Sequence, residues 1–291
     1  MKVINASVAL LRQSEGMDGV KKQIERAGRT AYKSVNKIHD GSADRFVEML
    51  KEKKHNAVFE HGTIYLCTTS KRISLKYMSN LYSVVYVGNP YGNHMYIGCD
   101  EGYVYRQGGT PIQDNHAYIT TNYRVIVENG WEDDLQYLCE PTRHHERRYT
   151  LSFITSRAIA NEFVRHRHFS FVQESTRWCN YSKGRFGGQI ECVIPTAIKP
   201  DTEQYLQWEK GMRYAEHWYM ELSENKVKPE IARDLLPLGM KTELVMTGTR
   251  TEWNNFFKLR CANDAHPDAR YLAEKAREII YEEEEQYDAE S

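Results

Sequence analysis

The chain has 291 residues, of which 41% are hydrophobic and 27% are charged, and its formal net charge is −1. This length and composition are ordinary for a globular protein and allow a substantial buried core. A net charge so close to zero gives no overall basic field, which argues against a general nucleic-acid binder but leaves room for a local anion site.

The six cysteines lie far apart and form no C-x-x-C pair. The first residues, MKVINASVALLRQSEGMDG, lack the long apolar core of a signal peptide, and no stretch approaches about 18 apolar residues. We therefore expect a cytoplasmic protein with reduced thiols and no membrane span. Spacing assigns no partner base to Cys179, so we do not expect it to be a nucleophile.

Strands and helices alternate in the first part of the chain. Residues 3–10 and 63–69 are rich in β-branched and aromatic side chains, which predicts strands. Between them, apolar residues recur at helical spacing over residues 18–32. Ser42 is placed to cap a second helix over residues 42–54.

The middle of the chain predicts further strands. Residues 86–110 are rich in Gly and Tyr and predict short strands joined by turns. Residues 148–155 alternate in polarity and predict a strand that leads into a helix over residues 156–167.

The last third of the chain predicts helices over residues 201–224, 229–235, 240–260 and 267–283. Pro229 suits the first turn of the second of these helices. The acidic sequence from about residue 284 predicts a frayed, solvated tail.

Residues 157–182, RAIANEFVRHRHFSFVQESTRWCNYS, concentrate polar and basic groups. Arg165, His166 and Arg167 end the predicted helix, where successive side chains turn by about 100° each and cannot all bury on one face. That arrangement suits a junction of two anionic ligands, and the run from Gln173 to Arg177 adds groups that recognise phosphate and base edges. Taken alone, however, basic residues that complement a helix C-terminus explain residues 165–167 better.

Further sequence matches favour the ligand-binding interpretation of residues 165–167. The pattern R-H-R, seven residues and then Ser is the signature of flavin-dependent thymidylate synthases, and the chain carries it as Arg165-His166-Arg167-(HFSFVQE)-Ser175, with Arg177 two residues later. The other matching elements are Phe59-Glu60-His61 for F-E-H, Ala232-Arg233 with Leu236-Pro237 for A-R-x-x-L-P, Asn255 to Arg260 for N-x-x-x-x-R, and Ala265-His266 for the H-A-Q region. The chain resembles this family from about residue 26 to 275.

The resemblance implies a mixed α/β (α+β) fold, with an antiparallel-type sheet flanked by long helices. It implies a single domain over residues 1–291, with an insertion around residues 82–147. The implied reaction converts dUMP to dTMP, with methylenetetrahydrofolate as carbon donor and FAD, re-reduced by NADPH, as hydride carrier. The implied assembly is a homotetramer with sites at subunit interfaces, and neither nucleic acid nor a membrane is an expected partner.

The resemblance also implies the site residues. Those for dUMP are Glu162, Arg165, Gln173, Glu174, Ser175, Arg177, Arg233 and Arg260. Those for FAD are His61, Thr63, Arg165, His166, Arg167, Gln173, Thr249, Asn255 and His266. Arg260 would be the catalytic residue, because a guanidinium at the uracil edge stabilises negative charge on the ring without any tuning of its pKa. Ser175 lacks a base and is expected to bind ligand, and no metal is expected.

The chain departs from the family pattern at four positions. Gln173 replaces a frequent Glu, Glu162 a frequent Gln, Trp178 a Tyr and Thr249 an Asn. The segment before His266 is also two residues longer than the common pattern.

Two other classes of protein would use the same residues. A metal-dependent hydrolase would use His166, His168 and the run His144-His145-Glu146, yet no third ligand stands at a telling distance and no H-E-x-x-H occurs. A non-catalytic RNA-binding module would use the basic and aromatic segment RHRHFSF. No G-x-G-x-x-G follows a strand and opens a helix, so a Rossmann flavoprotein is not expected.

Overall fold

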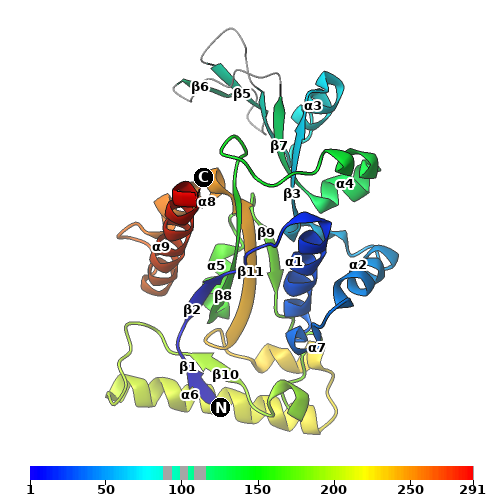
Figure 1. Ribbon diagram of the computed structural model, residues 1–291. Coiled ribbons are helices and arrows are strands. Elements are labelled where there is room, and N and C mark those ends of the chain that lie inside the picture. The colour runs from blue at the N-terminus through cyan, green and yellow to red at the C-terminus, as the bar shows by residue number, and fades with distance from the viewer. Residues whose placement is uncertain (88–93, 99–103, 108–115, 291) are drawn as a thin grey trace.

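The computed structural model describes residues 1–87, 94–98, 104–107 and 116–290 (Figure 1). Within this part of the chain the strands form sheets of four, five and two strands, and helices cover them. Every pairing in the two larger sheets is antiparallel. The predicted fold class, mixed α and β with an antiparallel sheet, is therefore confirmed.

The central sheet has the strand order β2-β8-β11-β9. Its strands are β2 (Ser7–Leu10), β8 (Arg148–Ser156), β11 (Lys241–Thr249) and β9 (Ser170–Gln173). The helices α5 (Arg157–Phe163), α8 (Arg250–Arg260) and α9 (Pro267–Glu290) cover one face, and α1 (Gly16–Ala31) covers the other. Phe153 and Leu244 are register partners and face the first of these cores.

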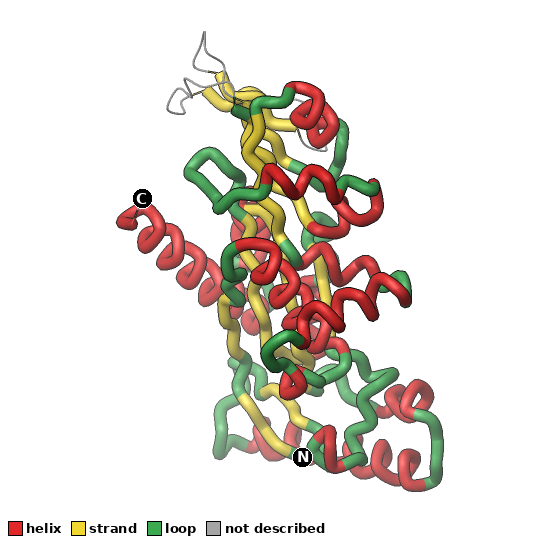
Figure 2. Tube along the Cα trace, turned by 45° about the vertical axis from the view of Figure 1, so that its right-hand side comes forward, coloured by secondary structure: helices red, strands yellow, loops and turns green. Residues whose placement is uncertain are grey.

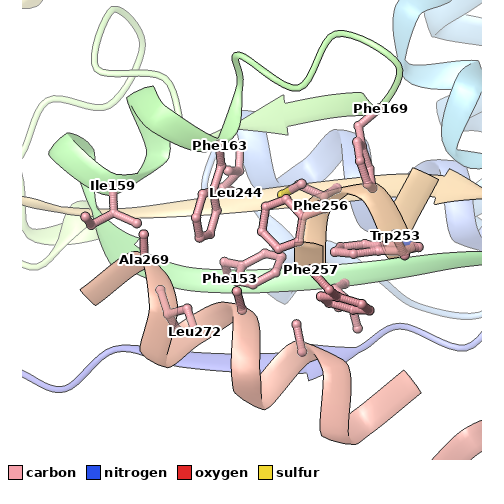
Figure 3. Packing of buried hydrophobic residues seen from close by; sticks show 14 of the residues in the cluster. Phe153, Ile159, Phe163, Phe169, Leu244, Trp253, Phe256, Phe257, Ala269 and Leu272 are labelled. Carbon is pink, nitrogen blue, oxygen red and sulfur yellow. The ribbon is translucent and has the colours of Figure 1, made fainter. Parts of the chain in front are cut away.

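The core between the central sheet and α8 is aromatic (Figure 3). The rings of Phe163 and Phe256 meet edge to face with centroids 5.1 Å apart, and those of Phe169 and Trp253 with centroids 4.7 Å apart. Edge-to-face pairs of this kind add to the stabilisation that burial provides. This packing holds the C-terminal ends of α5 and α8 next to each other, where most of the candidate site residues follow.

The single helix predicted over residues 240–260 is wrong. Residues 241–249 form β11, and only residues 250–260 are helical. The strand lies between β8 and β9, which satisfy its backbone hydrogen bonds on both edges, and it is buried on both faces. Thr249 ends the strand and starts the helix with a capping box, in which its hydroxyl accepts from Glu252 N and the Glu252 carboxylate accepts from Thr249 N.

Two other predicted boundaries need correction. The helix predicted over residues 156–167 ends at Phe163, so residues 165–167 lie in a turn after α5 and not in its last turn. The strand predicted over residues 3–10 is two strands, β1 (Lys2–Ile4) and β2, which join different sheets.

Ser42 does not cap α2 (Ser42–Glu52), so that prediction is also wrong. The capping position is Gly41, whose φ of 75° is in the left-handed region that favours glycine. Ser42 is the first helical residue, and its hydroxyl donates to the buried carboxylate of Glu25 at 2.8 Å. That carboxylate also pairs with Arg29, so the start of α2 is tied to α1.

The five-stranded sheet lies beyond one end of the central sheet (Figures 1 and 2). Its order is β3-β7-β4-β5-β6, with the strands β3 (Thr63–Thr68), β7 (Ala117–Asn122), β4 (Val84–Val87), β5 (His94–Gly98) and β6 (Val104–Gln107). Its helices are α3 (Lys71–Met78) and α4 (Tyr123–Asn129). The short strands predicted over residues 86–110 are confirmed where the structure describes them, and the connections between them lie outside the described residues.

The predicted frayed tail is wrong, because α9 continues to Glu290. Glu283 pairs with Arg12 at 2.6 Å, and Glu284 accepts from the Tyr149 hydroxyl at 3.1 Å. The Tyr287 hydroxyl donates to the carbonyl of Pro141 at 2.9 Å. The last turns of the helix therefore pack on the start of β8.

At the opposite end from the five-stranded sheet, β1 pairs in parallel with β10 (Glu191–Val193) beside α6 (Glu203–Glu224) and α7 (Pro229–Ala232) (Figure 1). The predicted long helix and the predicted helix opened by Pro229 are thus confirmed. The 3₁₀ helices are η1 (Val35–Lys37), η2 (Asn56–His61), η3 (Glu132–Tyr137), η4 (Gly184–Phe186) and η5 (Arg233–Leu235). Among the described residues, the helices are all too short or too polar to cross a membrane.

Candidate functional site

Three predicted site residues from distant parts of the sequence meet at the ends of α5 and α8. Arg260, the last residue of α8, donates from Nη1 to the Glu162 carboxylate at 2.7 Å and from Nη2 to the Glu162 carbonyl at 2.8 Å. Its Nε donates to His166 Nε2 at 2.9 Å. We call Arg260, Glu162 and His166 the Arg260 cluster.

The Arg260 cluster fixes the protonation of His166. A guanidinium only donates, so His166 Nε2 must accept, and the neutral ring carries its hydrogen on Nδ1. Burial, together with the charge of Arg260, lowers the pKa of His166 to about 4. The imidazole is therefore a neutral donor at physiological pH, and it packs against the ring of Phe256 with centroids 5.0 Å apart.

Arg260 retains capacity for a ligand. Three of its five N–H groups donate to Glu162 and His166, which leaves one hydrogen on each Nη nitrogen. The side chain is held on three sides yet still 19% exposed. Glu162, 28% exposed, places a carboxylate beside the guanidinium and so fixes its plane as well as its position.

A second group surrounds His61 at the end of η2. His61 is fully buried, and its Nδ1 lies 2.7 Å from the Thr247 hydroxyl, which in turn lies 2.8 Å from the Thr150 hydroxyl. Its Nε2 makes no hydrogen bond of good geometry in the described part of the chain, although the ring lies close to the backbone of Phe171. Burial and the charge of Arg148 lower the pKa of His61 to about 3, so the ring is neutral.

The segment after β9 holds a buried ion pair. Glu174 is 2% exposed; one carboxylate oxygen accepts from Lys241 Nζ at 2.7 Å and the other from the Tyr181 hydroxyl at 2.7 Å. Burial and the Glu174 charge raise the pKa of Tyr181. Gln173 donates to the Thr242 hydroxyl at 3.2 Å, and Ser175 N donates to the Ala31 carbonyl at 3.0 Å, so the segment is anchored to β11 and α1.

Four predicted ligands are exposed arginines, which we call the surface arginines: Arg165, Arg167, Arg177 and Arg233. In the described residues, none of their guanidinium groups makes a hydrogen bond or an ion pair. Exposed charged side chains commonly face open solvent, so the lack of a partner does not by itself define a binding site. It does leave all four free to bind anions.

The remaining predicted residues lie apart from the Arg260 cluster. Thr249 caps α8, and Thr63, at the start of β3, accepts from Arg148 at 3.4 Å. Asn255 is exposed on α8, and His266, exposed before α9, accepts from Asp268 N at 3.2 Å. Within the described residues, no hydrogen bond joins any of these four to the Arg260 cluster.

Sequence reasoning missed Arg148 and Lys241. Arg148 donates to the Glu60 carbonyl at 3.1 Å and so holds the turn that carries His61, while Lys241 neutralises Glu174. Each is the first residue of its strand, Arg148 in β8 and Lys241 in β11. A basic residue at that position is ordinarily exposed, so the sequence did not distinguish either one as a site residue.

Two of the groups that a metal site would need, His145 and Glu146, are occupied by hydrogen bonds. His145 Nδ1 accepts from Thr142 N at 3.0 Å, so Nε2 carries the hydrogen and donates to the Leu66 carbonyl at 3.1 Å. The Glu146 carboxylate accepts from the Tyr86 hydroxyl and from Thr251 N. These bonds argue against the metal-dependent hydrolase.

Comparison with known proteins places the second half of the chain. Residues 141–284 match the family model Thy1, described as thymidylate synthase complementing protein. This segment includes every predicted site residue except His61 and Thr63. The sequence resemblance is therefore confirmed over residues 141–284, the segment that this family model matches.

Curated relatives carry the name flavin-dependent thymidylate synthase. The protein of Pyrococcus abyssi is 33% identical over 130 residues, which are 45% of this chain and 52% of that protein. That of Pyrococcus furiosus is 34% identical over 42% of this chain and 50% of its own length, and that of Synechocystis sp. is 31% identical over 45% and 65%. The chain thus spans about half the length of the first two relatives.

Solved structures show weaker likeness. The UMP/dUMP methylase PolB from Streptomyces cacaoi, bound with 5-Br dUMP, has a TM-score of 0.42 and 14% identity over 97% of this chain and 93% of that chain. The flavin-dependent thymidylate synthase ThyX from Helicobacter pylori, complexed with FAD and dUMP, has a TM-score of 0.36 and 23% identity over 44% and 65%.

Proposed function

We propose that the protein is a flavin-dependent thymidylate synthase that converts dUMP to dTMP. The observation that carries this proposal is the Arg260 cluster, in which a guanidinium is held in a fixed plane with two hydrogens still free. It lies within the segment that matches the family, and its members are residues that the family resemblance assigns to the nucleotide and the flavin.

In the proposed reaction, Arg260 faces the N3 and O2 edge of the uracil ring. A permanently charged donor there stabilises the negative charge that makes C5 nucleophilic, and Glu162 keeps the guanidinium oriented before the substrate arrives. The surface arginines Arg165, Arg177 and Arg233, with Ser175, supply donors for the phosphate of dUMP. Glu174 holds Lys241 and Tyr181 under the same segment, which keeps Ser175 in place.

The residues present fit a flavin. His166 offers its Nδ1 hydrogen. In the described residues, no carboxylate pairs with Arg165 or Arg167, and His61 Nε2 has no hydrogen bond and can accept or donate one. Bound FAD would supply the hydride chemistry, re-reduced by NADPH, with methylenetetrahydrofolate as carbon donor. Thr63, Gln173, Thr249, Asn255 and His266 are the further proposed contacts.

We also propose that more than one subunit completes the site, as a homotetramer would allow. In the described residues, no hydrogen bond or ion pair joins Arg177, Arg233, Asn255 or His266 to the Arg260 cluster, although all are proposed to hold the same two ligands. A second copy can bring such exposed groups together.

The test is a visible spectrum of the purified protein, followed by anaerobic addition of NADPH and an assay of dTMP with dUMP and methylenetetrahydrofolate. We expect flavin absorbance, bleaching by NADPH and formation of dTMP only when dUMP is present. A colourless protein that neither binds added FAD nor forms dTMP, but binds RNA, would instead support the non-catalytic module.

A further inference from the structure

A cavity of about 170 Å³ opens between the segment after β2, the start of β8 and the end of α9. Its lining includes Thr63, the three arginines Arg12, Arg147 and Arg148, and the two carboxylates of Glu140 and Glu283. We call it the Arg147 cavity. Of the predicted site residues only Thr63 lines it; the proposed phosphate ligands of dUMP do not.

The positive charges of the Arg147 cavity are incompletely compensated. Arg12 pairs with Glu283 at 2.6 Å. Arg147 makes no side-chain hydrogen bond or ion pair with the described residues, and its Nη1 is buried. Its guanidinium carbon lies 4.0 Å above the Tyr287 ring, which holds the group in place without neutralising it.

Arg148 is in a similar position. It donates only to uncharged oxygens: the Glu60 carbonyl at 3.1 Å, the Thr63 hydroxyl at 3.4 Å and the Thr121 carbonyl at 3.5 Å. The last two distances are long for hydrogen bonds. Burial lowers the pKa of Arg148, and the charges of Glu252 and Glu60 oppose that shift only in part.

Arg147 has no ion pair with the described residues, and its charge stays without a direct partner because arginine cannot lose its proton as a buried lysine can. An anion in the cavity would supply the opposite charge and the acceptor that Arg147 Nη1 lacks. We propose that the Arg147 cavity binds a small oxyanion, a phosphate group, through Arg147 and Arg148. This site lies beyond the proposed dUMP and Arg260 chemistry.

The size of the cavity limits the ligand. Its volume is several times the roughly 30 Å³ that one water molecule occupies in the liquid, so a phosphate group with a few waters fits. The phosphate could be free in solution or could be the pyrophosphate of FAD reaching in past Thr63. Both sources share the same chemistry.

The experiment is a thermal unfolding titration with inorganic phosphate at constant ionic strength, with chloride as the balancing anion, followed by calorimetry. We expect phosphate, and not chloride, to stabilise the full-length protein. The variant R147Q should bind phosphate at least about tenfold more weakly, since one charged partner is lost. The matched control is R45Q, which removes an exposed arginine of α2 and should bind like the original protein.

A second readout separates binding from folding. Because R147Q removes an uncompensated charge, its unfolding temperature in phosphate-free buffer should equal or exceed that of the original protein. Equal phosphate affinity in R147Q and the original protein, or equal stabilisation by chloride, would overturn the proposal.

Repeating the titration with saturating FAD distinguishes free phosphate from the pyrophosphate of FAD. One-for-one displacement of phosphate by FAD identifies the flavin pyrophosphate, whereas unchanged phosphate affinity identifies free phosphate. Both outcomes require that R147Q be impaired. They hold whether or not dTMP is formed, so failure of the proposed function and failure of this site can be told apart.

Discussion

Arg260 has two neighbours that limit its freedom, the Glu162 carboxylate and the His166 imidazole. A side chain held in this way does not have to be ordered when the substrate binds, and electrostatic stabilisation by preorganised groups is often the largest contribution to catalysis. The role of Arg260 can be separated from flavin binding by substitution.

We expect R260A to lower the rate of dTMP formation by about 10²–10³-fold, the usual effect of removing one preorganised donor. Flavin absorbance after gel filtration should be largely retained, because Glu162 is partly exposed and can be solvated. The control is K258A, an exposed position of the same helix. Near-normal turnover in R260A would show that the ring is activated by another group.

For Glu174, a role in binding dUMP and a role in stabilising the fold predict different effects of substitution. Both carboxylate oxygens already have partners, and E174Q would leave Lys241 buried without an opposite charge. We expect E174Q to destabilise the fold by about 3–5 kcal/mol in denaturant unfolding.

The control for E174Q is the double variant E174Q/K241M, which removes both charges and should recover much of the lost stability. If E174Q instead unfolds like the original protein and only its affinity for dUMP falls, then Glu174 is a ligand, as the family resemblance implies.

Among the elements, β11 and α8 show that local sequence alone does not decide between strand and helix. The stretch KTELVMTGT has β-branched residues, but its apolar residues also fit a helical spacing, so periodicity does not decide between the two. Tertiary structure decides: β8 and β9 take its hydrogen bonds, and both belong to parts of the chain far away in sequence. Tertiary structure also decides the start of α2. Gly41 is at the capping position, and the hydroxyl of Ser42 donates to Glu25 of α1 instead.

Thr249 has two candidate roles, capping α8 and binding FAD. We expect T249A to destabilise the protein by about 1 kcal/mol, because the hydroxyl that accepts from Glu252 N is lost. T249S keeps that hydroxyl and should restore stability. Unchanged unfolding of T249A together with weakened FAD binding would favour the cofactor role.

The sequence motif proposes the residues of the candidate site but not their arrangement. The motif spacing identified Arg165, His166, Ser175 and Arg260, and the family match covers them. It could not show that Arg260 bonds Glu162 and His166, because those contacts join α8 to α5 across nearly a hundred residues. The role of Arg148 could not be predicted for the same reason, since only the fold places it next to His61 and Glu60.

At the scale of the whole molecule, two buried histidines and the half-buried His166 link stability to pH. Burial lowers the pKa of His61 to about 3 and those of His145 and His166 to about 4, from an ordinary value of 6.5. Above pH 6.5 each ring is neutral in the folded and the unfolded chain. As the pH falls below 6.5, only the unfolded chain takes up protons, so the free energy of unfolding decreases until the folded pKa is reached.

We therefore expect stability to fall between pH 6.5 and 5, with each histidine adding at most about 1.4 kcal/mol per pH unit. Denaturant unfolding at a series of pH values measures this slope. H145Q should reduce it by up to one proton, and H217N, at an exposed position of α6, should leave it unchanged. A slope that H145Q does not alter would contradict the neutral state of His145.

The pairing of β8 with β11 has a consequence for biosynthesis. Phe153 meets Leu244, so the middle of the central sheet closes only when a segment about ninety residues downstream has been made. At roughly 5–20 residues per second, β8 waits about 5–20 s after synthesis for its partner. During that interval the apolar strand and Phe163 of α5 are not covered by β11 and α8, so chaperone binding at this stage would affect the yield of native protein.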